Sequence, residues 1–89
     1  MNAVGAHLGS DLVDRMMDLY CDWRTECAEV QAAYDRFLDA SPADRSAVFA
    51  AYTAALDREE SACEAYAAQV LLLESRLDAA GARARRHPL

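Results

Sequence analysis

The residues best suited to chemistry gather in one short stretch, where three glutamates surround a cysteine. These residues are Glu59, Glu60, Cys63 and Glu64. Carboxylates that project into a helical bundle bind metal ions, usually beside a histidine in a Glu-x-x-His pair. Both histidines of this chain lie near its ends instead. We therefore expect no metal and no cofactor, and a solvated acidic surface for Glu60 and Glu64. A bundle that binds a metal or an apolar ligand around Trp23, Glu59 and Cys63 stays open as an alternative.

Glu59 is the one charged residue in an otherwise apolar stripe. A carboxylate is costly to bury unless it is paired or hydrogen-bonded. Trp23 lies opposite Glu59 when the two predicted helices are aligned antiparallel. Its indole N–H needs an acceptor when it is buried. We predict a buried polar contact between Glu59 and Trp23 that fixes the alignment of two helices, as polar residues do in coiled coils. The alternatives are a ligand contact and a local rotation that exposes Glu59.

The cysteines carry no catalytic pattern. Cys21, Cys27 and Cys63 have no histidine beside them in sequence, so a nucleophile is not indicated. The chain also lacks a glycine-rich phosphate loop, zinc-ligand spacing and a Ser-His-Asp order. We expect no catalytic residue and no enzyme. Three unpaired cysteines fit a cytoplasmic protein with reduced thiols, and nine arginines without a lysine fit a GC-rich bacterial genome.

Two stripes of apolar residues with 3–4 spacing predict the helices that must position these side chains. The first stripe consists of Val13, Met16, Tyr20, Trp23, Cys27, Val30, Tyr34 and Phe37. The second consists of Phe49, Tyr52, Leu56, Glu59, Cys63, Tyr66, Val70, Leu73 and Leu77.

Capping residues predict where these helices begin and end. Ser10 is a good N-cap for the first helix, which we place at about 11–39. Ser41 caps a second helix at about 42–80, with Pro42 at its first position, and Gly81 suits its C-cap. The expected organisation is a flexible lead at 1–9, a helical hairpin domain at 10–81 and a basic flexible tail at 82–89.

Two long helices joined by so short a turn must fold back antiparallel. With the turn near residues 40–41, facing residues have numbers that sum to about 82 or 83. The stripes agree with this rule at every layer, which is strong support for an all-α antiparallel hairpin. The facing pairs are Tyr34 with Phe49, Val30 with Tyr52, Cys27 with Leu56, Trp23 with Glu59, Tyr20 with Cys63, Met16 with Tyr66 and Val13 with Val70.

A hairpin has one seam and no enclosed core, so its apolar side chains need a further cover. Apolar residues also flank the stripes near the open end, and exposed patches of that size mark interfaces. We predict a homodimer that forms a four-helix bundle, and another protein partner remains possible. The predicted dimer interface consists of Leu12, Met16, Met17, Leu19, Tyr20, Trp23, Tyr66, Val70, Leu71, Leu72 and Leu73.

Charge and hydropathy argue against two other classes of partner. The net charge is −6, and the three arginines after residue 82 make the rest of the chain still more acidic. An acidic body repels nucleic acid phosphates and anionic lipid. No apolar run approaches the roughly 20 residues that span a bilayer. We expect neither nucleic acid nor membrane as a partner.

In length and two-helix architecture the chain resembles the small WXG-type secreted helical hairpins of bacterial type VII systems. Their Trp-x-Gly turn is absent, because the only tryptophan is Trp23 and the turn is Ser41-Pro42. Their C-terminal Tyr-x-x-x-Asp/Glu signal is absent as well. The resemblance is one of shape and implies no functional residues. Three hypotheses follow: a non-enzymatic interaction module with an adaptor or regulatory role, a small ligand-binding bundle, and a secreted hairpin without the usual motif.

Overall fold

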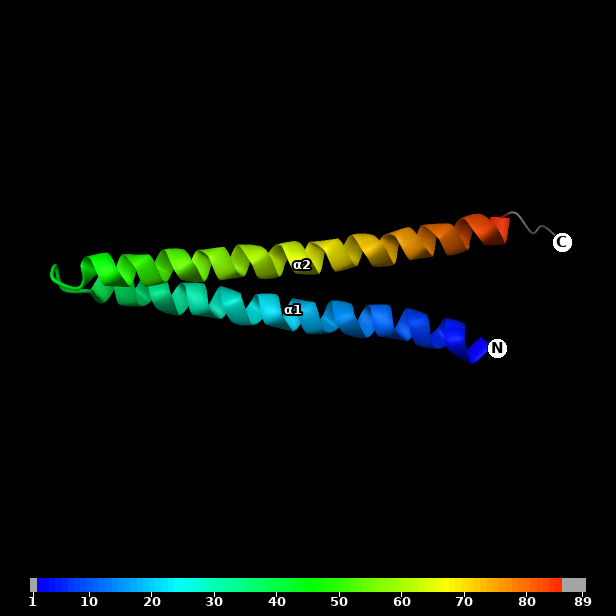
Figure 1. Ribbon diagram of the computed structural model, residues 1–89, viewed down its shortest axis with the longest axis horizontal. Coiled ribbons are helices and arrows are strands. Elements are labelled where there is room, and N and C mark those ends of the chain that lie inside the picture. The colour runs from blue at the N-terminus through cyan, green and yellow to red at the C-terminus, as the bar shows by residue number, and fades with distance from the viewer. Residues whose placement is uncertain (1, 86–89) are drawn as a thin grey trace.

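Two helices make up the part of the chain that the computed structural model describes, residues 2–85 with side chains from residue 9 onward. Helix α1 (Asn2–Asp39) and helix α2 (Arg45–Arg85) run antiparallel as a rod of 73 × 21 × 13 Å (Figure 1). The two helices lie close together at the turn and diverge toward the chain ends (Figure 1). The predicted all-α hairpin is confirmed.

The turn is held by the residues that the sequence singles out. The backbone N–H of Asp44 donates to the hydroxyl of Ser41 at 3.3 Å, and that hydroxyl donates to the Asp44 carboxylate at 3.1 Å. The N–H of Val48 then donates to the carbonyl of Asp44 at 3.0 Å, which opens the helical ladder. Residues 42–44 form a turn rather than helix. Helix α2 therefore begins at Arg45, slightly later than predicted.

Both helices extend further from the turn than the capping residues predict. Residues 2–9 are helical, so Ser10 lies inside α1 and caps nothing. Gly81 has no positive φ and lies inside α2, which continues to Arg85. A glycine costs a helix only about 1 kcal/mol, and the alanines on both sides of Gly81 are good helix formers. Within the predicted lead and tail, residue 1 and residues 86–89 lie outside the described residues.

The seam between the helices is narrow and built partly from alanine. Only Leu19, Ala33 and Ala55 are buried among the described residues, with 8%, 2% and 1% of their surface exposed. Two alanines at this depth let the backbones approach closely near the turn. Partly buried side chains continue the seam on both helices: Leu12, Met16, Trp23, Glu26, Val30 and Phe37 on α1, and Val48, Tyr52, Glu59, Ala62, Tyr66, Gln69 and Leu73 on α2.

The seam is rotated relative to the predicted stripes. In each helix one predicted line of residues lies inside it, such as Met16 and Trp23 on α1. The other predicted line lies beside it, and Leu19 and Ala33 take its place inside. On each helix, the line inside the seam forms a 3–4 pattern with the neighbouring line on either side of it. The spacing alone therefore does not tell which of the two neighbouring lines is buried with it. Small side chains at residues 33 and 55 favour the observed choice.

Aromatic rings pack across the seam next to the turn. Phe37 lies 5.6 Å from Phe49 and stacks on Tyr52, with ring centroids 6.3 Å apart and planes 13° from parallel. Tyr34 contacts Tyr52 at 5.6 Å. Each such pair contributes on the order of 1 kcal/mol beyond the area it buries. These contacts join the two helices next to the turn.

Candidate functional site

Trp23 and Glu59 meet across the middle of the seam. The indole N–H of Trp23 donates to a Glu59 carboxylate oxygen at 2.9 Å, and the contact is partly buried. The Trp23 ring stacks on Tyr66, with centroids 5.8 Å apart and planes 14° from parallel, and Tyr20 packs edge-on against it at 6.1 Å. The carboxylate thus has a donor and the donor has an acceptor. The geometry is that of a polar contact which aligns two helices.

Replacing Glu59 tests whether this contact stabilises the hairpin. Glu59→Ala leaves the Trp23 N–H without its acceptor, and we expect a loss of about 1–2 kcal/mol in the free energy of unfolding. Glu59→Gln keeps a carbonyl acceptor and should stay within about 0.5 kcal/mol of the parent chain. Urea unfolding at one fixed protein concentration measures both. Equal losses for the two variants would show that the hydrogen bond contributes nothing.

The acidic stretch of α2 is a shallow surface rather than an enclosed site. A groove of about 440 Å³ runs along this helix, lined by Leu56, Glu59, Glu60, Cys63, Glu64 and Ala67. Glu60 and Glu64 are exposed, and Glu59 is already engaged by Trp23. Between residues 9 and 85 no group of three or more His, Cys, Asp or Glu side chains is placed to hold a metal ion. The geometry here favours a solvated acidic surface.

A continuous apolar surface covers one side of the hairpin, and we name it the apolar face. It consists of the two lines of residues that lie beside the seam: Val13, Tyr20, Cys27 and Tyr34 on α1, and Phe49, Leu56, Cys63, Val70 and Leu77 on α2. Members of each line are seven residues apart, so each line stays on one side of its helix. Six of the nine are large side chains exposed by 37–63%.

Helix geometry places both lines on the same side of the hairpin. Tyr20 lies four residues after the seam residue Met16, and Leu56 lies four residues after the seam residue Tyr52. Four residues forward is the same rotation on both helices. Antiparallel helices are related by a two-fold axis perpendicular to the plane that contains them. Equivalent lines therefore lie on the same side of that plane.

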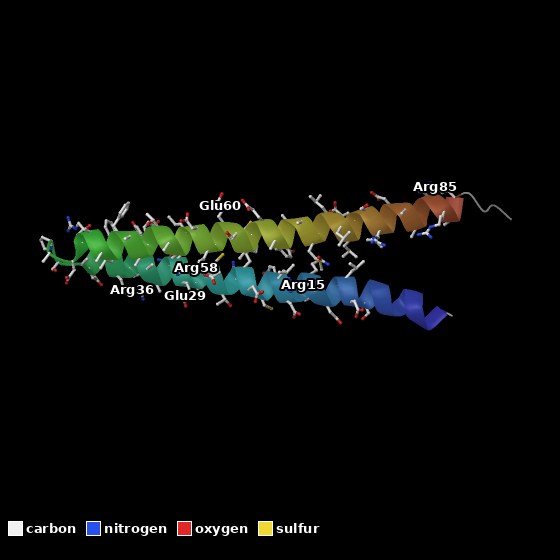
Figure 2. The ribbon with its side chains drawn as sticks, viewed as in Figure 1. Arg15, Glu29, Arg36, Arg58, Glu60 and Arg85 are labelled. Atoms are coloured by element: carbon white, nitrogen blue, oxygen red, sulfur yellow. The ribbon has the colours of Figure 1, made fainter. Side chains whose placement is uncertain are left out.

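The opposite side of the hairpin is charged on α1 and mostly small or apolar on α2. The corresponding line on α1 consists of Arg15, Asp22, Glu29 and Arg36, and all four are exposed. On α2 the line carries one charged residue, Arg58, which pairs with Glu26 at 3.4 Å. Its other members are Ala51, Ala65, Leu72 and Ala79. Figure 2 shows Arg58 between the two helices and Glu60 on the side of α2 that points away from α1. The two sides of the hairpin thus differ in charge: the opposite side carries five charged residues in these lines, and the apolar face carries none.

The structure distributes the predicted interface residues over several surfaces. The seam within the hairpin takes up six of them: Leu12, Met16, Leu19, Trp23, Tyr66 and Leu73. Tyr20 and Val70 lie on the apolar face, and Met17 lies at its edge. Leu71 and Leu72 are exposed elsewhere on α2. Sequence reasoning placed Tyr34, Phe49 and Leu77 in the stripes but not in the interface, although their exposure of 41–63% makes them natural members.

A second groove lies at the open end, where the helices diverge (Figure 1). It measures about 490 Å³ and is lined by Gly9, Leu12, Leu73, Arg76, Leu77, Ala80 and Arg83.

Among the described residues no helix has a window apolar enough to cross a bilayer. No protein-family model, curated protein or solved structure matches this chain.

Proposed function

We propose that this chain is a non-enzymatic protein-interaction module that works as a homodimer. Two hairpins pack their apolar faces together and form a four-helix bundle. The observation that supports this proposal best is the apolar face itself, a two-helix-wide surface that nothing within the described residues covers. The free thiols of Cys21, Cys27 and Cys63 fit a reducing compartment such as the cytoplasm.

The isolated hairpin has little to hold it together. Three buried residues, two of them alanines, give it almost no core. Fully burying a large apolar side chain contributes roughly 1.5–3 kcal/mol. The large members of the apolar face still expose 37–63% of their surface, so covering each one contributes on the order of 1 kcal/mol. Two chains contribute two such faces, which is enough to offset the cost of association.

A second copy fits this face better than an unrelated surface does. The face is a pair of antiparallel apolar lines with a seven-residue repeat, and helices with that repeat pack against others that share it. A second hairpin presents the same repeat, width and length. The apolar faces carry no charge, so the net charge of −6 on each chain stays on the dimer's solvated exterior, where an adaptor or regulatory contact can form.

A dimer makes the melting temperature depend on protein concentration. Mass action stabilises the folded state when folding and association are coupled. We expect the helix melt of the full chain, followed by circular dichroism, to shift upward by several degrees between about 1 and 100 μM, since a chain of this size gains roughly 4–8 °C per kcal/mol. A melting temperature that stays constant over this range would contradict the proposal.

A further inference from the structure

We propose that the two hairpins of the dimer lie in register, with both turns at the same end. Each α1 then packs against the partner's α2, and Arg24 of one chain pairs with Glu60 of the other. This inference rests on the proposed function, because it describes how the two apolar faces meet. It adds the orientation of the partner and the residues that select it.

The two edges of the apolar face carry different side chains. Each edge consists of the residues four positions after the members of an apolar-face line, as Arg24 follows Tyr20 and Glu60 follows Leu56. On α1 it consists of Met17, Arg24, Gln31 and Leu38, and on α2 of Ser46, Thr53, Glu60, Ala67 and Glu74. The α1 edge has one charge, which is positive, and the α2 edge has two, which are negative. Arg24 and Glu60 are both exposed, and neither takes part in an ion pair within residues 9–85.

The alignment within one chain gives the height of each edge residue. Arg58 and Glu26 form an ion pair across the hairpin's own seam, and their numbers sum to 84. Arg24 and Glu60 also sum to 84. When the partner's α2 lies against α1 in the same antiparallel register, these two side chains stand at the same height. Opposite charges at such edge positions set partner choice and orientation in coiled coils.

The remaining edge residues match in the same register. The residue numbers of each pair again sum to 84, and in two of the three pairs the side chains have similar polarity. The pairs are Met17 with Ala67, Gln31 with Thr53, and Leu38 with Ser46. An in-register dimer therefore has one attractive ion pair along each of its two edges and no like-charge contact between these residues.

The opposite orientation places like charges together. With the turns at opposite ends, α1 packs on the partner's α1 and α2 on the partner's α2. Overlap of the α1 lines of the two apolar faces, from Val13 to Tyr34 in each chain, centres the two-fold axis midway between these residues, close to the height of Arg24. The two Arg24 side chains then approach each other, and so do the two Glu60 side chains. Like charges at facing edges disfavour this arrangement.

Charge reversal distinguishes the two orientations. In the in-register dimer, Arg24→Glu or Glu60→Arg alone turns two attractive pairs into repulsive ones, and we expect the dissociation constant to rise about 10- to 30-fold. The double variant Arg24→Glu/Glu60→Arg restores both pairs and should return to within about threefold of the parent chain. Sedimentation equilibrium at low salt measures all of these constants.

Matched controls change the same charges on the opposite side of the hairpin. Arg15→Glu and Glu29→Arg are exposed reversals on α1 away from the apolar face, and they should leave the dissociation constant within about threefold. A dimer that neither Arg24→Glu nor Glu60→Arg weakens would overturn the pairing while leaving the proposed function intact. A parent chain that is monomeric throughout would overturn both.

A distance between the two turns provides an independent measurement. Ala43→Cys in a chain whose three native cysteines are replaced by alanine accepts one spin label at each turn. Pulsed electron paramagnetic resonance on the dimer should give a distance below about 30 Å, since helices of a bundle lie 8–10 Å apart. Turns at opposite ends would lie roughly 50 Å apart at 1.5 Å rise per residue, and that result would overturn the in-register arrangement.

Discussion

Leu56→Glu is expected to dissociate the proposed dimer into single chains, whereas Leu72→Glu should leave it intact. The two leucines lie on the same helix and are almost equally exposed in one hairpin, at 37% and 39%. Leu56 lies within the apolar face, and Leu72 lies on the other side of α2. A carboxylate buried in an apolar interface without a partner costs several kcal/mol. The dimer contains this substitution twice, once in each chain, so the dissociation constant should rise at least about 100-fold.

Size-exclusion chromatography with light scattering measures the mass of both variants at equal loading. Leu72→Glu serves as the matched control, because it adds the same charge to the same helix. Circular dichroism at high concentration shows whether each variant retains its helices. If Leu72→Glu dissociates the dimer and Leu56→Glu does not, the interface lies on the wrong side of α2. If neither variant dissociates it, the apolar face is not the interface.

Ala55→Leu is expected to destabilise the hairpin more than any other single enlargement of a side chain. Ala55 has 1% of its surface exposed and Ala33 has 2%, so both lie inside the seam between the helices. A leucine at residue 55 has no room unless the helices move apart, which also disturbs the ring contacts beside the turn. Overpacking of this kind typically costs about 1–3 kcal/mol.

Ala54→Leu is the control for this enlargement, because Ala54 is the adjacent residue and is exposed. It should change the free energy of unfolding by less than about 0.5 kcal/mol. Urea titrations at one fixed protein concentration compare the two variants without a contribution from dissociation. Equal stability of Ala55→Leu and the parent chain would mean that the helices do not approach closely here.

The hairpin is the part of this structure that the sequence predicts well. Ser41, Pro42 and Asp44 combine a cap, a residue that starts a helix and an acid that reaches back, and few arrangements other than a turn use all three. The outer helix ends are predicted less well. Ser10 and Gly81 are weak signals on their own, and the helices continue through both of them.

The residues that form the seam are harder to predict, because three adjacent lines of each helix contain apolar residues. On α1 these lines pass through Leu19, Met16 and Tyr20, and a 3–4 spacing fits any two neighbouring lines. Only packing decides which pair lies inside, and the buried alanines decide it here. The contact between Trp23 and Glu59 is easier to predict. Each of these residues belongs to the line that lies inside the seam, whichever neighbouring line is buried with it.

The mass of the full chain in solution tests the central claim most directly. Sedimentation equilibrium at tens of micromolar should give about 20 kDa, twice the 9.8 kDa of one chain, with dissociation on dilution. A mass of one chain at every concentration, together with a sharp unfolding transition, would contradict the account, because a hairpin with an uncovered apolar face would then be stable alone.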